Sequence, residues 1–516
     1  MYSIVSTASV SGIESILVQV EADVCDGMPV FEMVGELSTE VRESKERIRA
    51  AIRNTGIRLE PKRITVNLYP ADLRKSGTGF DLPIALAVLA AYGHISASYL
   101  EETVFAGEVS LNGSIHSIEG VLPMAIAARE AGKKRICIPQ ANIKEAALVK
   151  DIAILPAKSL GQVLEMLQNA GTSKAFYNGS NNIEETELKQ VEKEYDFKKI
   201  RGQKVLKRVC EIAAAGRHNL LMLGPPGSGK TAAARAIPGI LPELSQEEAL
   251  ELARIYSVSG LFGKREHNLR ERPFCHPHHT ITAAGMAGGG RIPKPGEISL
   301  AHNGVLFLDE MTEFQRTALE VLRQPLEEGK IHLVRNNGTY SYPADIMLVA
   351  AMNPCNCGYF PNRNKCTCTP AMIRRHLQKI SRPLLDRIDL CVEVQKPGIQ
   401  ELTGQTKEES SYENCQRVKE VQRIQTERYG QHGIRYNSRI PPEQIEQFCS
   451  MEPEAGSMLA EAFESLELSV RGYYKIIRVA RTIADLEGQE IIRCGHMAES
   501  LMYRNIDGRG WTGSEV

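Results

Sequence analysis

The sequence predicts a mixed α/β fold divided into several domains, and three observations lead to this prediction. The chain has 516 residues, a length that accommodates about three domains. Residues 224–231 read GPPGSGKT, which fits the G-x-x-x-x-G-K-[ST] pattern of a phosphate-binding loop. Largely apolar runs at 219–223, 305–310 and 346–353 predict buried strands, and the last two end in polar side chains.

The phosphate loop is the strongest functional signal in the chain. An apolar run precedes it and good helix formers follow it, which supplies the strand, loop and helix that phosphate binding needs. Backbone N–H groups of the loop and the positive end of the helix attract phosphate oxygens. Lys230 is expected to reach the outer phosphates of ATP, and the Thr231 hydroxyl to bind Mg²⁺. The predicted nucleotide-binding residues of this loop are Gly224, Pro225, Pro226, Gly227, Ser228, Gly229, Lys230 and Thr231.

Composition restricts the class of protein. Apolar residues make up 42% of the chain, yet no apolar run is long enough to span a membrane. The first residues lack the pattern of a signal peptide, so we expect a cytoplasmic location and no membrane partner. The 12 cysteines then indicate a reducing compartment, where metal binding is expected rather than disulfides. The net charge of −1 gives no argument for nucleic acid, which would need a local basic patch.

Residues 1–168 are expected to form a separate α/β domain. Short strands at 64–68 and 135–139 alternate with helical runs, of which residues 82–92 are apolar nearly all round and predict a buried helix. The segments GTGFDLPIALAVLA, FAGEVSLNGSIHSIEGVLPMAIAAREAG and KRICIPQAN resemble the proteolytic domain of Lon and the Lon-like domain of RadA. Residues 169–196 are polar with mixed charge, so they predict a flexible linker.

The Lon-like domain is expected to be non-proteolytic. Lon proteases use a serine–lysine dyad, and the matching places here hold Phe80-Asp81 and Leu122. A leucine cannot activate a nucleophile, and no serine occupies the other place. The remaining roles for this domain are oligomer contacts or ligand binding.

Two further strand ends carry candidate catalytic residues. Asp309 and Glu310 follow an apolar strand, so Asp309 is expected to hold Mg²⁺ through water and Glu310 to polarise the attacking water. Asn353 ends the next apolar strand, where its side chain could position that water. The alternative is that Asn353 only caps the strand before Pro354.

The motif RPLLDRID at 382–389 extends the resemblance to AAA+ proteins of the helix-2-insert group, which includes Mg-chelatases and MCM helicases. The resemblance implies an AAA+ αβα core at 197–400. It also implies that Arg387 reaches the nucleotide of a neighbouring subunit as an arginine finger, with Arg382 as the second candidate. Because such an arginine acts in trans, the implied assembly is a homo-oligomeric ring, and the expected ring is a hexamer.

Two loops match the nucleic-acid-binding insertions of that group. Residues 280–300 form a glycine-rich insertion, and residues 329–343 have strand-like flanks around Asn336-Asn337-Gly338, which is a hairpin signal. The resemblance implies DNA-backbone contacts by Arg291, Lys294 and Arg335, although each could be an ordinary exposed basic residue. The histidines of FCHPHHT at 274–280 match no standard metal spacing.

Four cysteines form a candidate zinc site inserted at 355–368. Cys355-x-Cys357 and Cys366-x-Cys368 are two close pairs separated by GYFPNRNK. Such pairs can surround one tetrahedral ion, and a four-cysteine set suits Zn²⁺. The C-x-C spacing is tighter than the usual C-x-x-C, and free cysteines are the alternative.

Residues 401–516 are expected to be helical. Apolar residues recur at helical spacing in 469–486, and the segment resembles the AAA+ lid, in which a sensor arginine lies near the start of a helix. Arg471 is the predicted sensor arginine, and Arg478 stays unassigned. The tail after Gly508 is predicted to be disordered.

The order of these segments, with GEISLAHNGVLFLDE, the cysteine pairs and RVARTIADL, resembles the ComM/YifB family. The resemblance implies an ATP-driven ring motor acting on single-stranded or branched DNA, as a branch-migration helicase in homologous recombination and natural transformation. The alternative is a Mg-chelatase-type or protein-remodelling ATPase that does not act on DNA. A third possibility, a scaffold with a dead ATPase, conflicts with the intact Lys230, Asp309, Glu310 and Asn353.

Overall fold

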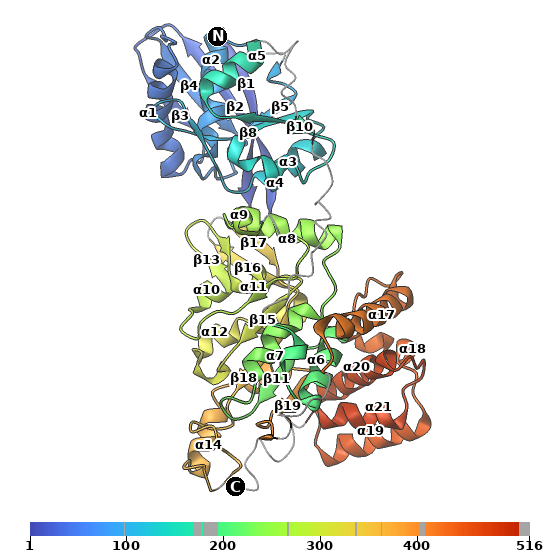
Figure 1. Cartoon of the computed structure of the whole chain (residues 1–516). Coiled ribbons are helices and arrows are strands. Elements are labelled where there is room, and N and C mark those ends of the chain that lie inside the picture. The colour runs from blue at the N-terminus through green and yellow to red at the C-terminus, as the bar shows by residue number, and fades with distance from the viewer. Residues whose placement is uncertain are drawn as a thin grey trace.

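The computed structural model shows three regions of the chain, each with its own secondary structure (Figure 1). The structure describes residues 1–96, 99–168, 177–178, 195–265, 268–335, 338–362, 364–399, 401 and 408–504. Most of the predicted linker at 169–196 and the whole tail after Gly508 lie outside these described residues. We call residues 1–168 the N-terminal region, 195–399 the central region and 408–504 the C-terminal region.

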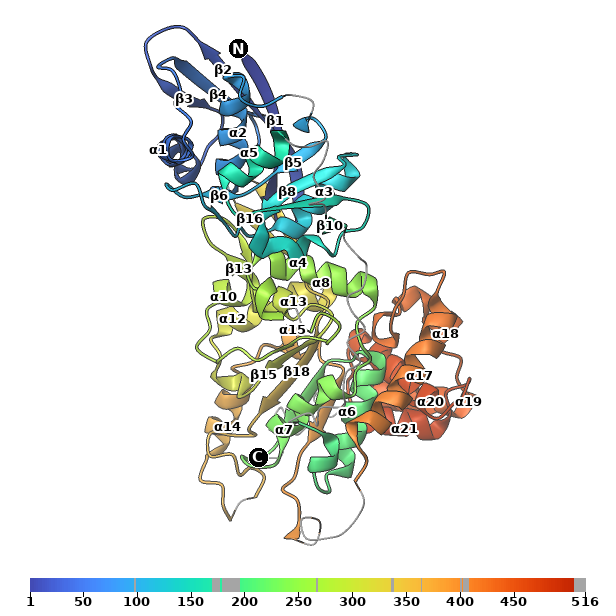
Figure 2. The same cartoon turned by 45° about the horizontal axis from the view of Figure 1, so that its top comes forward.

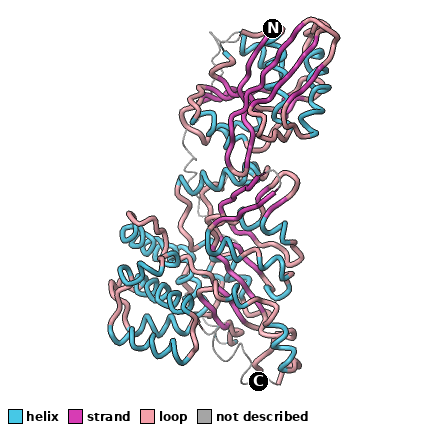
Figure 3. Tube along the Cα trace, turned by 180° about the vertical axis from the view of Figure 1, so that it is seen from behind, coloured by secondary structure: helices cyan, strands magenta, loops and turns pink. Residues whose placement is uncertain are grey.

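The N-terminal region, together with β10 at 177–178, forms a mixed eight-stranded sheet in the order β10-β9-β8-β5-β1-β2-β4-β3. Figure 3 shows the strands of this region in magenta. The helix predicted at 82–92 is present as α2, Asp81–Ala91, and ten of its eleven residues are buried because it lies against β1 and β2. The strands are β1 Tyr2–Ser11, β2 Glu14–Cys25, β3 Phe31–Val34, β4 Arg63–Tyr69, β5 Thr103–Phe105, β8 Arg135–Pro139, β9 Ala153–Ala157 and β10 Tyr177–Asn178. The other elements are α1 Thr39–Asn54, β6 Glu108–Val109, β7 Ile115–His116, α3 Val121–Glu130, α4 Ile143–Ala146 and α5 Leu160–Gln168.

The central region contains a five-stranded sheet in the order β12-β15-β18-β11-β19, in which every neighbouring pair is parallel. Parallel strands buried on both faces read as continuous apolar runs, which is why three of them could be predicted. Those three are β11 Leu220–Leu223, β15 Val305–Leu308 and β18 Met347–Met352, and the others are β12 Phe274–Cys275 and β19 Leu390–Glu393. The longer of its helices are α6 Lys204–Gly216, α7 Lys230–Ala236, α8 Gln246–Val258 and α14 Pro370–Leu377. Shorter ones are α9 Phe262–Arg265, α10 Ala283–Ala287, α11 Glu297–Leu300, α12 Arg316–Glu320, α13 Arg323–Glu328 and α15 Arg382–Leu385.

Two hairpins extend from the central region toward the N-terminal region (Figure 1). The first is the short pair β13 Gly288–Gly289 and β14 Lys294–Pro295. The second is β16 Lys330–Arg335 with β17 Gly338–Pro343, so the predicted hairpin at 329–343 is present. Its two tip residues, 336 and 337, lie outside the described residues.

The C-terminal region is helical, as predicted, and packs beside the central sheet (Figure 1). Its longest helix is α20, Val470–Leu486, whose buried face contacts α6 and α17. Lys475 of this helix pairs with the buried Asp389 at 2.7 Å, which fixes α20 to the start of β19. The other helices are α17 Ser411–Tyr429, α18 Ile445–Phe448, α19 Pro453–Ser465 and α21 Cys494–Met502. None of the described helices is long and apolar enough to cross a membrane.

The N-terminal region contacts the central region through α3 and α8 (Figure 2). Apolar side chains of both helices, including Ile126 and Leu252, belong to one buried cluster. Glu145 is buried at this contact and accepts hydrogen bonds from the Leu122 N–H and from the Ser257 hydroxyl of α8. Leu122, the residue expected at the place of the Lon lysine, is therefore part of a packed contact between regions.

Candidate nucleotide-binding site

The predicted phosphate loop connects β11 to α7 and has the backbone that its sequence requires. Gly227 and Gly229 have φ values of +73° and +94°, which non-glycine residues rarely adopt. A Cβ atom on Gly224 would lie 2.2 Å from the Val394 carbonyl oxygen, so only glycine fits there. The loop ends at the start of α7, whose first N–H groups have no partner within the helix and can bind phosphate oxygens.

Lys230 lies folded against this loop. Its ammonium donates hydrogen bonds to the carbonyl oxygens of Gly224 at 2.7 Å and Pro225 at 2.9 Å. Burial lowers the pKa of Lys230, and the charges of Asp309 and Glu310 act in the opposite direction. Backbone carbonyls are weak partners for a buried cation, so an incoming phosphate can take over this ammonium.

The two predicted Mg²⁺ ligands lie in contact. The Thr231 hydroxyl donates to an Asp309 carboxylate oxygen at 2.8 Å, and the other oxygen of Asp309 accepts from the Glu310 N–H at 3.0 Å. Glu310 has a φ of +51°, and its side chain is exposed. Residues of β11–α7 and β15 therefore meet at the carboxyl edge of the sheet, and a hydroxyl beside a carboxylate is a donor set that Mg²⁺ accepts.

Asn353 joins the same group from the end of β18. Its side-chain oxygen lies 3.5 Å from the Lys230 ammonium, and His376 Nε2 lies 3.1 Å from its backbone oxygen. Burial lowers the pKa of His376, so its neutral ring can donate to that carbonyl. Asn353 therefore faces the phosphate loop rather than only capping the strand.

The four cysteines come together two residues beyond Asn353. Cys355 lies with its sulfur 3.3 Å from that of Cys357 and 3.8 Å from that of Cys366, and all four sulfurs are within 4.8 Å of one another. Sulfurs about 2.3 Å from a tetrahedral zinc ion would lie about 3.8 Å apart, so the cluster fits Zn²⁺. Among the described residues this is the one group of three or more histidine, cysteine or acidic side chains close enough to share a metal.

The cysteine cluster also supports the phosphate loop. A Cβ atom on Gly358 would lie 2.6 Å from the Pro226 ring, so the backbone after Cys357 packs directly against the loop. The sequence predicted the cluster but not this contact, because the two segments are more than a hundred residues apart.

Arg387 and Arg471 lie at the opposite, amino edge of the sheet. Arg387 precedes β19 by three residues, and its Nε and two terminal nitrogens bond the Arg323 oxygen, the Pro383 oxygen and the Glu327 carboxylate. Arg471, at the start of α20, contacts the second oxygen of the same Glu327 at 2.9 Å. The two edges are on the order of 15 Å apart, the length of four to six strand residues. Neither arginine reaches the phosphate loop of its own chain, and the second finger candidate, Arg382, is exposed near them.

The three predicted DNA-contact residues gather where the central region meets the N-terminal region. Arg291, Lys294 and Arg335 are all exposed. The Lys294 ammonium is engaged by both oxygens of Glu119, from the N-terminal region, at 2.6 and 2.7 Å. The β1–β2 turn at Gly12 approaches the Ser341 oxygen of the second hairpin.

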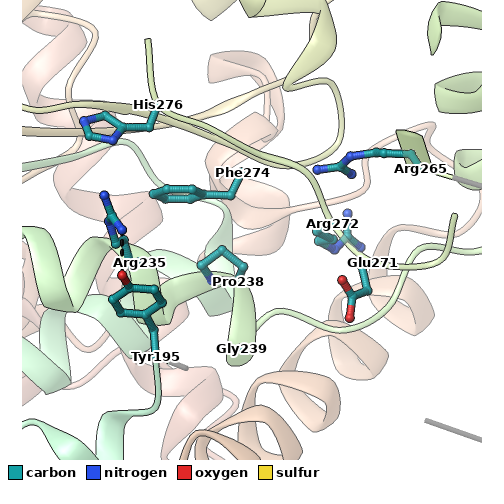
Figure 4. A pocket seen from close by; sticks show the side chains of 9 residues that line it. All are labelled: Tyr195, Arg235, Pro238, Gly239, Arg265, Glu271, Arg272, Phe274 and His276. Atoms are coloured by element: carbon teal, nitrogen blue, oxygen red, sulfur yellow. Dashed lines mark hydrogen bonds between the residues drawn. The ribbon is translucent and has the colours of Figure 1, made fainter. Parts of the chain in front are cut away.

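A cavity of about 520 Å³ lies beside the edge strand β12 (Figure 4). Arg235 of α7 donates to the Tyr195 hydroxyl at 2.6 Å and stacks on that ring, and both side chains face the cavity. His276 lies across from them, packed 4.9 Å from the ring of Phe307, and burial lowers its pKa. His276 therefore packs against Phe307, and no sequence pattern predicted this cavity.

Three family models match the chain. The magnesium chelatase subunit ChlI model covers residues 196–402, and the model of its C-terminal part covers residues 408–504. A model described as subunit ChlI of Mg-chelatase covers residues 20–142.

Several curated proteins are similar over the whole chain. The competence protein ComM of Haemophilus influenzae is 40% identical over 516 residues, covering 97% of each chain. The protein YifB of Escherichia coli is 41% identical over 511 residues, covering 98% of this chain and 97% of its own. Lon protease 2 of Bacillus subtilis is 30% identical over 143 residues, which is 27% of this chain and 26% of the protease. The chain therefore belongs to the ComM/YifB family of Mg-chelatase-like proteins.

Proposed function

We propose that this protein is an ATP-hydrolysing, ring-forming AAA+ motor that acts on DNA, as a branch-migration helicase in homologous recombination and natural transformation. The observation that supports ring formation and ATP hydrolysis is that the predicted site residues are divided between two edges of one sheet. Lys230, Thr231, Asp309 and Asn353 lie at the carboxyl edge, and Arg387 and Arg471 at the amino edge. One chain therefore offers two halves that only a neighbouring copy can join.

Each residue has a defined part in the proposed reaction. The loop and Lys230 hold the phosphates of ATP, and Thr231 and Asp309 hold Mg²⁺. Glu310 activates water, and Asn353 orients it beside the terminal phosphate. Arg387 of the adjacent subunit supplies positive charge as negative charge develops on the transferred group. Arg471 acts beside it from the C-terminal region, which serves as the lid domain.

The proposed domains follow the three regions. Residues 1–168 are a non-proteolytic Lon-like domain, 169–196 a linker, 197–400 the AAA+ core and 401–516 the lid. Residues 280–300 are the helix-2 insert, and the cysteine cluster holds a structural Zn²⁺.

DNA is the proposed partner because the two hairpins present exposed cations together. Arg291 and Lys294 lie on the first and Arg335 at the tip of the second, and the Arg335 guanidinium lies 3.2 Å from where a Cβ on Gly289 would be. Two loops that share one cationic surface suit a phosphate backbone. The Haemophilus influenzae relative is named a competence protein, which agrees with the proposed part in natural transformation.

The test is the ATPase rate with and without forked or single-stranded DNA. We expect stimulation of several-fold, and DNA retention that falls steeply with salt because bound phosphates release counterions. Electron microscopy with a slowly hydrolysed ATP analogue should show closed rings. A ring-forming ATPase with neither stimulation nor retention would favour the alternative, a Mg-chelatase-type or protein-remodelling ATPase.

A further inference from the structure

One carboxylate, that of Glu327, connects the two arginines at the amino edge of the sheet. One oxygen of Glu327 lies 2.6 Å from a terminal nitrogen of Arg387, and the other lies 2.9 Å from a terminal nitrogen of Arg471. Arg387 belongs to the central region and Arg471 to the C-terminal region. Glu327 therefore bridges the two regions through the two side chains that the proposed reaction needs in trans.

The three side chains run from the interior to the surface. The Arg387 side chain is 10% exposed, Glu327 is 45% exposed and Arg471 is 59% exposed. Arg387 is also held by the carbonyl oxygens of Arg323 and Pro383, so it forms the fixed end. Arg471 is the outer end, and a planar guanidinium with one edge on a carboxylate keeps other N–H groups free to face outward.

The place of Arg471 is not explained by the stability of its own helix. It lies in the first turn of α20, where the helix dipole disfavours a cation and no acidic residue is present. Ser469 already caps this helix by accepting from the Gly472 N–H. Glu327 is the one carboxylate within 4 Å of Arg471 in the described part of the chain. The bridge across the two regions is therefore the contact that orients this arginine.

The support for Glu327 is itself rigid. It lies on the last turn of α13, whose terminal carbonyls accept hydrogen bonds from Arg439 at 3.0 and 3.4 Å. Arg439 in turn pairs with Asp345 just before β18. Four residues beyond Arg471, Lys475 fixes α20 to Asp389. Both ends of the bridge are thus tied to the amino edge of the sheet.

We propose that Glu327 is a positioning residue that holds Arg387 and Arg471 as one unit for the nucleotide of the neighbouring subunit. This inference rests on the proposed function, in which both arginines act in trans. Glu327 neutralises two guanidinium groups that would otherwise repel each other, and it fixes the direction of the more exposed one. A phosphate that develops charge then meets the exposed Arg471 already aligned, with the charge of Arg387 behind it, without the cost of ordering a free side chain.

The central test replaces Glu327 with glutamine, which keeps the shape of the side chain but removes its charge. We expect kcat for ATP to fall about tenfold while KM and ring assembly stay unchanged, because the arginines act on the transition state. The control is Glu328→Gln on the same helix, whose carboxylate is 56% exposed and accepts from Gln324. Equal kcat in the two variants, or a raised kcat in Glu327→Gln, would overturn the inference.

A double variant separates positioning from general stabilisation. If Glu327 acts in part through Arg471, the kcat losses of Glu327→Gln and Arg471→Ala are less than multiplicative in the double variant, since effects are not additive within one interacting pair. Losses that multiply would mean that Glu327 acts elsewhere. Glu327→Asp is the second variant. It keeps the negative charge but shortens the side chain by one methylene, so it should also lower kcat. A full rate of hydrolysis in this variant would contradict the bridge.

A mixing experiment distinguishes failure of this inference from failure of the proposed function. Lys230→Ala subunits retain the arginine half of the site, and Arg387→Ala subunits retain the phosphate half. If mixing them restores hydrolysis but Glu327→Gln alone is fully active, the site is shared between subunits and only the role of Glu327 is refuted. If mixing restores nothing, the shared site itself is refuted, and the role of Glu327 falls with it.

Discussion

The two edges of the central sheet carry different parts of the proposed ATPase site. At the carboxyl edge, the groups belong to one continuous loop and to two strand ends, and they already contact one another, as Thr231 and Asp309 do. At the amino edge, Arg387 and Arg471 come from segments more than eighty residues apart and meet only through Glu327. In the proposed function, the first edge binds a nucleotide alone, whereas the second acts only on the nucleotide of another chain. Variants at the two edges should therefore differ in which step they affect.

The largest effect is expected at the carboxyl edge, from Lys230→Ala. The buried ammonium is the cation nearest to where the outer phosphates would lie, so its loss should weaken ATP binding by at least about 100-fold. Equilibrium binding of a fluorescent ATP analogue measures this effect. Lys419→Ala, on the exposed face of α17, is the control and should bind normally. Normal affinity in Lys230→Ala would refute the nucleotide site.

Arg387→Ala should impair ATP hydrolysis rather than ATP binding. Hydrolysis should fall by about 10³-fold because a trans-acting arginine stabilises the transition state, while ATP affinity stays near normal. Steady-state turnover and analogue binding, measured on the same sample, separate the two quantities. Arg382→Ala is the matched comparison: if that variant loses turnover instead, the finger is Arg382. Because Arg387 is nearly buried, circular dichroism must show that the variant is folded.

The two edges also differ in how far the sequence could predict them. The phosphate loop was fully predictable, because its eight residues are consecutive and their backbone geometry depends on glycine. Asp309 and Asn353 were predictable because buried parallel strands are continuous apolar runs and their polar ends meet at one edge.

At the amino edge, the family resemblance pointed to Arg387 and Arg471, but no local pattern pointed to Glu327. Glu327 lies in an ordinary polar helix, and its two partners follow 60 and 144 residues later, so only the folded chain shows the bridge. The contacts of Gly358 with Pro226 and of Glu119 with Lys294 could not be predicted either, because the partners are far apart in the sequence. Sequence periodicity reports which face of an element is buried, but it does not report which distant polar groups become partners.

A substitution in the cysteine cluster should weaken ATP binding at the carboxyl edge without changing a phosphate-binding residue. Cys357→Ser should lose the metal and lower ATP affinity about tenfold, since Gly358 packs against Pro226 of the loop. Elemental analysis should find about one zinc per chain in the unaltered protein and far less in the variant. Cys25→Ser, an exposed cysteine outside the cluster, is the control. Less than about one zinc per four chains in the unaltered protein would contradict a zinc site.

The smallest expected effect lies where the β13–β14 hairpin meets the N-terminal region. Glu119 engages the Lys294 ammonium, and both side chains are about half exposed, so their interaction is worth at most about 1 kcal/mol. If Lys294 contacts DNA, Glu119 competes with the phosphates, and Glu119→Gln should raise DNA affinity about two- to fivefold at low salt. Raising the salt should erase the gain, because exposed charges are screened.

Fluorescence anisotropy with a labelled fork measures this change. Glu130→Gln removes another exposed carboxylate, whose one ion pair in the described part of the chain is with Arg129 at 3.8 Å, so it should leave affinity unchanged. Lys294→Gln should bind DNA more weakly, and adding Glu119→Gln to it should give no gain, because the competing partner is already absent. A gain that persists in that double variant would mean that Glu119 acts through general charge rather than through Lys294. In that case the N-terminal region would tune the field of the whole cationic surface and not a single contact.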